Sequence, residues 1–67
     1  MKIFCLNGHF YGTFNHITLF DLIKYFNYDS SLLIVEYNKL ICPKSKWIEI
    51  SICKNDIIEI ISIVGGG

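Results

Sequence analysis

Arginine, alanine and glutamine are absent from this 67-residue chain, proline occurs once, and only five residues are glycine. The six basic residues are therefore all lysine, and six Asp and Glu residues bring the formal net charge to zero. Nucleic-acid-binding proteins need a basic stripe that neutralises phosphates, which this balance does not supply. The longest purely aliphatic run, residues 32–35, is far shorter than the ~20 residues needed to cross a bilayer. We therefore expect neither a nucleic-acid partner nor a membrane-spanning helix.

Isoleucine dominates what is present: it fills thirteen of the 67 positions, and 52% of the chain is hydrophobic. The abundant residues Ile, Lys, Asn, Phe and Tyr have AT-rich codons, whereas the missing Ala and Arg have GC-rich ones. This bias indicates an AT-rich genome, such as that of an organelle, an endosymbiont or a low-GC bacterium. Residues 1–6 begin like a signal peptide, but Asn7 and Gly8 end the apolar run too early, and no Arg-rich transit peptide is expected. A chain of this length forms one small domain with a thin core.

The three cysteines, Cys5, Cys42 and Cys53, are widely spaced and form no C-x-x-C pair. A disulfide framework would leave one thiol unpaired, so a reducing compartment fits better. Together with His9 and His16 they could form a metal or redox site, but their spacing matches no zinc template. We expect no bound metal; a small metal or redox protein that uses the three cysteines is an alternative hypothesis.

Turn and capping signals divide the chain into strands and one helix. Asn7-Gly8 is typical of a type I′ hairpin turn, which needs positive φ at both central residues. Thr18 and Asp21 have the spacing of a capping box and predict the start of a helix. Its apolar face repeats at i, i+3, i+4 and i+7; the face consists of Leu19, Leu22, Ile23 and Phe26. Stop signals at residues 27–31 predict its end.

The remaining segments predict a mixed sheet. Strands are expected at residues 2–7, 9–14, 32–37, 40–42 and 57–64, turns at 38–39 and 54–56, a loop or single helical turn at 43–47, and a short strand or loop at 48–52. A hairpin, a helix and then further strands are typical of an α+β fold. If the first and last strands pair in parallel at the centre, the fold is the β-grasp, or ubiquitin-like, fold. We predict a sheet of four to five strands with one main helix packed on one face, residues 1–64 forming this domain and residues 65–67 a flexible tail.

Alternation along the strands predicts an apolar outer face on the sheet. If Glu59 faces solvent, its strand turns Ile57, Ile61 and Ile63 outward and Ile58, Ile60 and Val64 toward the helix. In the same way Lys2 would bring Phe4 and Leu6 outward, and Glu36 would bring Leu32 and Ile34 outward. Monomers rarely expose such a patch, which favours a docking surface for a partner. The alternatives are genome bias in the surface residues and a phase error of one residue. The predicted partner-binding residues are Phe4, Leu6, Ile34, Ile61, Ile63 and Val64.

The sequence ends in Val64-Gly65-Gly66-Gly67, so three of its five glycines are consecutive. Three extended residues reach roughly 10 Å, and without Cβ atoms they can thread a narrow channel in another protein. Adenylation by ATP would turn a carboxylate at Gly67 into a mixed anhydride that a sulfur nucleophile can attack. A frayed end is the alternative interpretation. Elsewhere the carboxylates are scattered and the serines lack a neighbouring base, so we expect no enzyme active site of the chain's own.

Several segments, in this order, resemble the ThiS family, the small sulfur carriers of thiamin biosynthesis, which have the β-grasp fold. They are Thr18-Leu19-Phe20-Asp21-Leu22-Ile23, Val35-Glu36-Tyr37-Asn38, Pro43-Lys44 with Trp47, Asp56 with Ile58-Glu59-Ile60, and Val64-Gly65-Gly66-Gly67. The likeness runs essentially end to end. The chain departs from the family where Lys39 and Asn55 replace common glycines and where Lys44 replaces the usual arginine.

This resemblance implies a role as a protein co-substrate and not as an enzyme. A ThiF-like adenylating enzyme would activate Gly67, with Gly65 and Gly66 as its approach. Sulfur from a cysteine-desulfurase persulfide would convert the carboxylate to a thiocarboxylate, and a ThiG-like thiazole synthase would take the sulfur. ATP, Mg and zinc would belong to the partner enzyme, so the chain itself would bind no cofactor. Plastid-encoded members of the family in algae would fit the AT-rich bias, so we expect a plastid protein, with the cytoplasm of a low-GC bacterium as the alternative.

Two rival hypotheses remain beside the thiamin carrier. The small subunit of molybdopterin synthase shares the fold and the tail chemistry, although its chain is usually longer. A β-grasp interaction module would instead bind a partner through its apolar sheet face and carry an inert tail.

Overall fold

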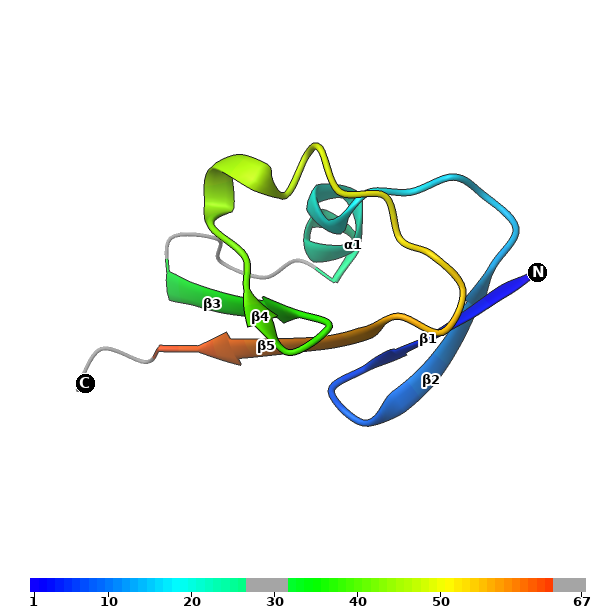
Figure 1. Cartoon of the computed structure of the whole chain (residues 1–67), viewed down its shortest axis with the longest axis horizontal. Helices are drawn as coiled ribbons and strands as arrows, with labels where there is room; N and C mark the ends of the chain where they lie inside the picture. Colours follow the sequence, from blue (N-terminus) through cyan, green and yellow to red (C-terminus); the bar gives the residue numbers. More distant parts are fainter. Residues whose placement is uncertain (27–31, 64–67) are drawn as a thin grey trace.

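The computed structural model describes residues 1–26 and 32–63 of the chain. Its elements follow one another as β1 (Lys2–Leu6), β2 (His9–Thr13), α1 (Leu19–Tyr25), β3 (Leu33–Tyr37), β4 (Leu40–Ile41), the 3-10 helix η2 (Lys44–Lys46) and β5 (Ile57–Ser62). The strands form one five-stranded sheet in the order β2-β1-β5-β3-β4 (Figure 1). β1 and β5 pair in parallel, and all other neighbours pair antiparallel. The β-grasp prediction is therefore confirmed, with the first and last described strands adjacent.

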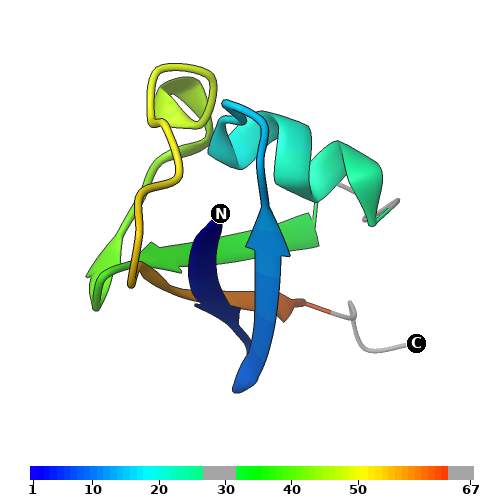
Figure 2. The ribbon, with the colours of Figure 1, turned by 90° about the vertical axis from the view of Figure 1, so that its right-hand side faces the viewer.

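The sheet forms one layer, and α1 and η2 lie together over one of its faces (Figure 2). The β1–β2 hairpin crosses the direction of β3 and β5 steeply in this view, which is the strong twist expected of a small mixed sheet. The core lies between the two layers and is closed by side chains that are all less than 8% exposed. They are Phe4, Leu6, Leu19, Leu22, Ile23, Val35, Cys42, Trp47, Ile52, Ile58 and Ile60.

Both hairpin turns are built on positive φ angles. Asn7 and Gly8 have φ of 49° and 81°, and Leu6 pairs with His9 across them. Asn38 and Lys39 have φ of 51° and 72° and join β3 to β4. These are the two-residue connections whose twist matches that of the flanking strands. The predicted turns at 7–8 and 38–39 are confirmed.

The capping box at the start of α1 is present. Thr18 Oγ1 accepts a hydrogen bond from the Asp21 backbone N–H (3.1 Å), and Asp21 Oδ2 accepts one from the Thr18 N–H (2.9 Å). The bonds from Thr18 hold the pKa of the Asp21 carboxyl below its usual value. Leu19, Leu22 and Ile23 are buried, and Phe26 packs against the core at its edge. The predicted apolar helix face is therefore confirmed, while the stop signals at 27–31 lie outside the described residues.

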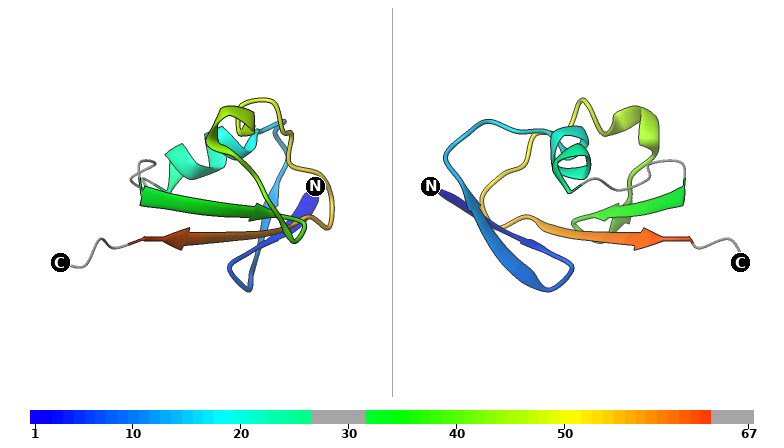
Figure 3. Two further views of the ribbon diagram at one scale, coloured as in Figure 1. Left: turned by 60° about the vertical axis from the view of Figure 1, so that its left-hand side comes forward. Right: turned by 180° about the vertical axis from the view of Figure 1, so that it is seen from behind.

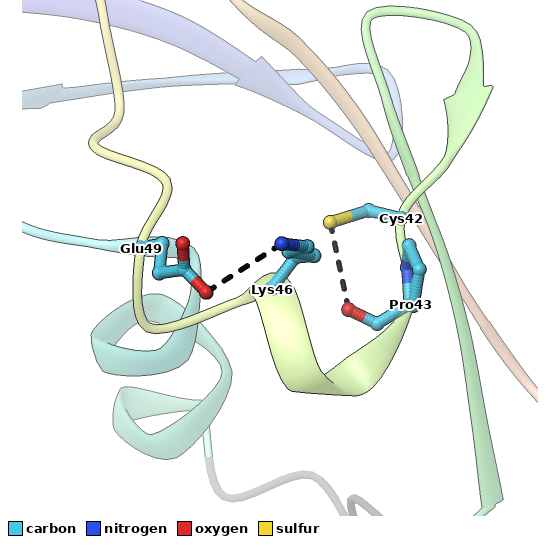
Figure 4. A network of polar contacts seen from close by, with 4 residues as sticks. All are labelled: Cys42, Pro43, Lys46 and Glu49. Carbon is cyan, nitrogen blue, oxygen red and sulfur yellow. Dashed lines mark hydrogen bonds and ion pairs between the residues drawn. The ribbon is translucent and has the colours of Figure 1, made fainter.

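The segment between β4 and β5 closes the end of the core. Trp47 is 1% exposed and donates from Nε1 to the Cys42 carbonyl (3.0 Å). Figure 4 shows the short 3-10 turn beside it, where Cys42 Sγ points to the Pro43 carbonyl and Lys46 Nζ lies 3.9 Å from Glu49 Oε2. Of the two forms predicted for residues 43–47, a loop and a single helical turn, the structure has the helical turn.

The following residues run beside the start of the helix as a loop. Leu19 donates its N–H to the Ile50 carbonyl and Ile52 to the Ile17 carbonyl, both at 2.9 Å. Of the two forms predicted for residues 48–52, the structure has the loop, with one isolated bridge at Ser51.

The predicted phase of β1 is wrong by one residue. Phe4 and Leu6 are each 3% exposed and face the core, whereas Ile3 is 38% exposed on the outer face. The prediction rested on Lys2, which shares the phase of Phe4 and Leu6. Its Nζ donates to the carbonyl of Ile52 at 3.2 Å, so the long stem follows the core side while the charged head is hydrogen-bonded at the rim of the core.

No helix among residues 1–26 and 32–63 is long and apolar enough to cross a membrane.

Candidate functional site

The outer face of β5 is a row of isoleucines interrupted by one acid. Ile57, Ile61 and Ile63 are 42%, 51% and 48% exposed, and Glu59 lies between them. Ile58 and Ile60, at the alternate positions, are 0% and 6% exposed. The predicted facing of this strand is therefore confirmed for its described residues. Both views of Figure 3 show α1 and η2 on the same side of β3 and β5.

Neighbouring strands extend this apolar surface on both sides of β5. On β3, Ile34 pairs with Ile61 and is 36% exposed. On the other side Cys5 pairs with both Ile57 and Phe10, and Phe10 is 78% exposed. We call this surface, on the face of the sheet that α1 and η2 leave uncovered, the outer face. Its described apolar members are Ile3, Cys5, Phe10, Ile34, Ile41, Ile57, Ile61 and Ile63.

Gly12 widens the outer face at the edge strand β2. A Cβ on Gly12 would lie 2.7 Å from Met1 Sδ and 3.1 Å from Ile3 Cδ1. The absence of a side chain therefore leaves room for Met1 and Ile3 to lie across β2. Met1 is itself 69% exposed, so the apolar surface continues over the strand.

Two acidic side chains stand opposite each other on the outer face. Glu36 of β3 pairs directly with Glu59 of β5 in the antiparallel register. Ile34 and Ile61 form the preceding outward-facing pair, and Ile41 of β4 lies opposite Glu36 on its other side. The outer face therefore has a negative centre within an apolar surround.

A buried carboxylate fixes the start of β5 and with it the register of the outer face. Asp56 is 6% exposed and accepts hydrogen bonds from Tyr37 Oη (2.6 Å), Asn38 Nδ2 (3.0 Å) and the Cys53 N–H (2.6 Å). Its backbone carbonyl accepts from the Cys5 N–H at 2.9 Å, which links the start of β5 to β1. Asn38 Oδ1 in turn accepts the Ile57 N–H at 2.8 Å. Asp56 therefore connects β1, β3 and the turn before β5.

The charges and hydrogen bonds of this network stabilise the fold. Burial raises the pKa of the Tyr37 hydroxyl well above its usual value, and its hydrogen bond to the Asp56 carboxylate raises it further. Tyr37 is thus held as a neutral donor. The sequence predicts Asp56 and its neighbours only as parts of a motif and not this arrangement, because the bonded partners are 3 to 19 residues apart along the chain.

Two other sets of reactive side chains among the described residues are a cysteine thiol and a serine–histidine pair. Burial raises the pKa of the Cys42 thiol, which keeps it protonated and unreactive. Ser51 Oγ lies 2.9 Å from His16 Nε2, but this exposed pair joins the connector before α1 to the loop after Trp47, beside the bridge between Thr18 and Ser51. Among residues 1–26 and 32–63, no three His, Cys, Asp or Glu side chains gather to hold a metal ion.

One cavity lies on the helix side, away from the outer face. It measures about 420 Å³ and opens between β2 and α1. Its aromatic lining includes Phe4, Tyr11, Tyr25 and Phe26, and Tyr11 contacts both Phe4 and Phe26 with ring centroids 6.0 and 5.4 Å apart.

The predicted site residues fall into three groups. Ile34, Ile61 and Ile63 lie together on the outer face, as predicted. Phe4 and Leu6 belong to the core, so their assignment to partner binding is wrong. Val64, Gly65, Gly66 and Gly67 lie outside the described residues. Ile3, Cys5 and Phe10 were missed; the register of β1 against β5 would have revealed them, but no local pattern encodes it.

Comparisons with known proteins identify a family and a fold. The ThiS family model matches residues 6–67. The protein ycf40 of Trieres chinensis is 54% identical over 66 residues, which cover 98% of this chain and 90% of the relative. The sulfur carrier protein ThiS of Bacillus subtilis is 40% identical over 50 residues, covering 75% of this chain and 76% of the relative. The crystal structure of the thiamine biosynthesis protein ThiS from Geobacter metallireducens has the same fold, with a TM-score of 0.82 at 16% identity, and covers 98% of this chain and 100% of its own.

Proposed function

This chain belongs to the ThiS family of sulfur carriers, and we propose that it carries sulfur for thiazole formation in thiamin biosynthesis as a thiocarboxylate at Gly67. The observation that carries the proposal is the family match, which spans residues 6–67 and therefore includes the glycine segment. The fold places a free apolar surface along β5, the strand that precedes this segment. A carrier needs both features, because one binds an enzyme and the other enters its active site.

The proposed chemistry takes place on the carboxylate of Gly67 and not on the folded domain. The carboxylate attacks the α-phosphorus of ATP, which forms an acyl adenylate and releases pyrophosphate. The terminal sulfur of a persulfide then attacks the acyl carbon and AMP leaves. A thiol reduces the resulting acyl disulfide, which frees the thiocarboxylate. Mg–ATP, the persulfide and the thiol belong to the partner enzymes, so this chain acts as their co-substrate.

We assign the outer face to binding of these partners. Ile57 and Ile61 lie on β5 and Ile63 directly after it, so an enzyme that covers them is positioned to receive the glycine segment that follows. Monomeric proteins rarely leave an apolar surface of this extent in water. The partners are an adenylating enzyme, a cysteine desulfurase as the sulfur source and a thiazole synthase. The molybdopterin pathway is the alternative, since its carrier uses the same tail chemistry.

Intact mass spectrometry tests the proposal directly. Incubation with ATP, a ThiF-like adenylating enzyme and a persulfide donor should first give an adenylated chain and then replace one oxygen by sulfur, about 16 Da heavier, at Gly67. A chain that lacks Gly66 and Gly67 serves as the matched control and should remain unmodified. Equal activity of this truncated chain in sulfur delivery would contradict the proposal. Delivery to thiazole synthase and not to the large molybdopterin subunit separates the two pathways.

The proposed compartment is the plastid. The relative from Trieres chinensis carries a ycf40 name, which suggests a plastid genome. The excess of Ile and Lys over Ala and Arg fits an AT-rich genome of this kind. Immunodetection in isolated plastids against the cytosolic fraction tests this proposal.

A further inference from the structure

The paired acids at the centre of the outer face carry an inference about the partner. Glu36 and Glu59 are directly opposite in the β3–β5 register, and both lie on the outer face, because their neighbours Val35 and Ile60 are buried in the core. Directly opposed side chains of an antiparallel pair have Cβ atoms roughly 5 Å apart. Like charges at such positions destabilise the sheet. The free protein therefore keeps an unfavourable pair in the middle of its binding surface.

The described part of the chain supplies no cation to this pair. Within residues 1–26 and 32–63 the only ion pair joins Lys46 to Glu49, beside η2 and away from the outer face. Lys2 is also committed, because its Nζ donates to the carbonyl of Ile52. The chain has no arginine at all, so it cannot place a planar, multidentate cation against both carboxylates.

The surroundings of the pair select a particular kind of cation. Ile57 and Ile61 flank Glu59 along β5, Ile34 precedes Glu36 on β3, and Ile41 lies opposite it on β4. An enzyme surface that covers these isoleucines removes water from the two carboxylates, whose charge then has to be compensated. A guanidinium is more weakly hydrated than an ammonium and presents donors to two carboxylates at once.

We propose that the partner that docks on the outer face inserts an arginine guanidinium between Glu36 and Glu59, surrounded by an apolar ring that covers the isoleucines. This inference deepens the proposed carrier function and rests on it. It assigns recognition to charge complementarity at the centre and desolvation at the rim. The two acids lower the stability of the free chain and strengthen its complex, so the two effects of removing them have opposite signs.

The test compares binding and stability in one set of variants. ATP–pyrophosphate exchange by the adenylating enzyme reports the KM for the carrier. The double variant E36Q/E59Q should raise this KM about tenfold or more at low salt and leave kcat unchanged, because the reacting carboxylate is untouched. Added NaCl should raise the KM of the wild type more than that of the double variant. The urea midpoint of the free double variant should rise, since the repulsion is gone.

E49Q is the matched control, because it removes one exposed glutamate next to η2 and leaves the outer face unchanged. Its KM should equal that of the wild type. Arginine-specific labelling of the enzyme gives the second readout: wild-type carrier should protect one arginine of the enzyme from phenylglyoxal, and E36Q/E59Q should not. A double variant with wild-type KM would overturn the inference and leave the acids as charges that keep the apolar face soluble. A raised KM without any protected arginine would contradict the assignment of the partner's cation to an arginine.

The same assay separates this inference from the function beneath it. Exchange that depends on wild-type carrier, together with an unchanged KM for E36Q/E59Q, contradicts only the guanidinium. The absence of any exchange or mass change with wild-type carrier contradicts the carrier function itself.

Discussion

The two faces of β5 carry the same side chain in opposite environments. Ile58 and Ile60 are 0% and 6% exposed, while Ile57 and Ile61 are 42% and 51% exposed on the same strand. Hydrophobicity alone therefore does not distinguish the core from the binding surface in this chain. The distinction comes from the layer formed by α1 and η2, which covers one face of the sheet and leaves the other open (Figure 2). Folding uses one face, and partner binding is proposed to use the other.

The largest effect should come from a cavity on the covered face. Ile58→Ala removes three carbons from a fully buried position and should lower the free energy of unfolding by about 2–5 kcal/mol. Urea denaturation followed by circular dichroism measures this loss. Ile61→Ala is the matched control on the open face and should cost well under half as much. Equal losses at the two positions would contradict the assignment of the faces.

A somewhat smaller effect is expected where the register of β5 is fixed. Asp56→Ala leaves the donors of Tyr37, Asn38 and Cys53 without their acceptor, which should cost roughly 1–3 kcal/mol. Thermal or urea denaturation checks this loss. Tyr37→Phe removes one of the three bonds and should cost less. A tolerated Asp56→Ala would mean that the pairing with β1 and β3 holds the register unaided.

The same network predicts a dependence on alkaline pH. The folded pKa of Tyr37 lies above the unfolded value near 10.0. The stability that this difference contributes is therefore fully present below pH 10 and is lost as the pH rises through the folded pKa. Urea midpoints measured from pH 8 upward should fall in the wild type beyond pH 10, and Tyr37→Phe should remove part of that slope. Identical slopes would show that other groups govern alkaline unfolding.

The cap of α1 should contribute less than the core does. Thr18→Ala removes the hydroxyl that accepts the Asp21 N–H, and the loss of this cap should lower the free energy of unfolding by about 1 kcal/mol. The loss affects the whole domain because α1 is part of the layer that covers Ile58. Thr18→Ser keeps the oxygen and is the control. Comparable denaturation midpoints for the two variants would show that the hydroxyl at position 18 does not stabilise the helix.

The smallest change in stability and a large change in binding should come from the open face. Ile61→Ser should alter the free energy of unfolding by no more than about 0.5 kcal/mol, as surface substitutions usually do. It should nevertheless raise the KM for the adenylating enzyme severalfold. Pyrophosphate exchange and urea denaturation on the same sample measure both quantities. A loss of stability without any loss of binding would reverse the roles given to the two faces.

Local patterns predicted those parts of the fold that depend on neighbouring residues. The capping box of Thr18 and Asp21 and the turn at Asn7-Gly8 need only a few consecutive residues, and both formed as predicted. The alternation of β5 was readable because Glu59 interrupts its isoleucines. β1 gave no such signal, since residues 3–6 are all apolar and Lys2 follows the core side. The opposition of Glu36 and Glu59 depends on the register between strands far apart in the chain, which no local pattern contains.

The position of β5 also has a consequence for synthesis. It is the last described strand along the chain, yet it occupies the middle of the sheet between β1 and β3. A nascent chain released before β5 lacks the central strand. Without it β1 and β3 have no common neighbour, and the two halves of the sheet could not join. The molecules that pass cellular quality control in a folded state are therefore those translated through this strand. The complete sheet therefore forms only in chains translated through β5, the strand that precedes the glycine segment.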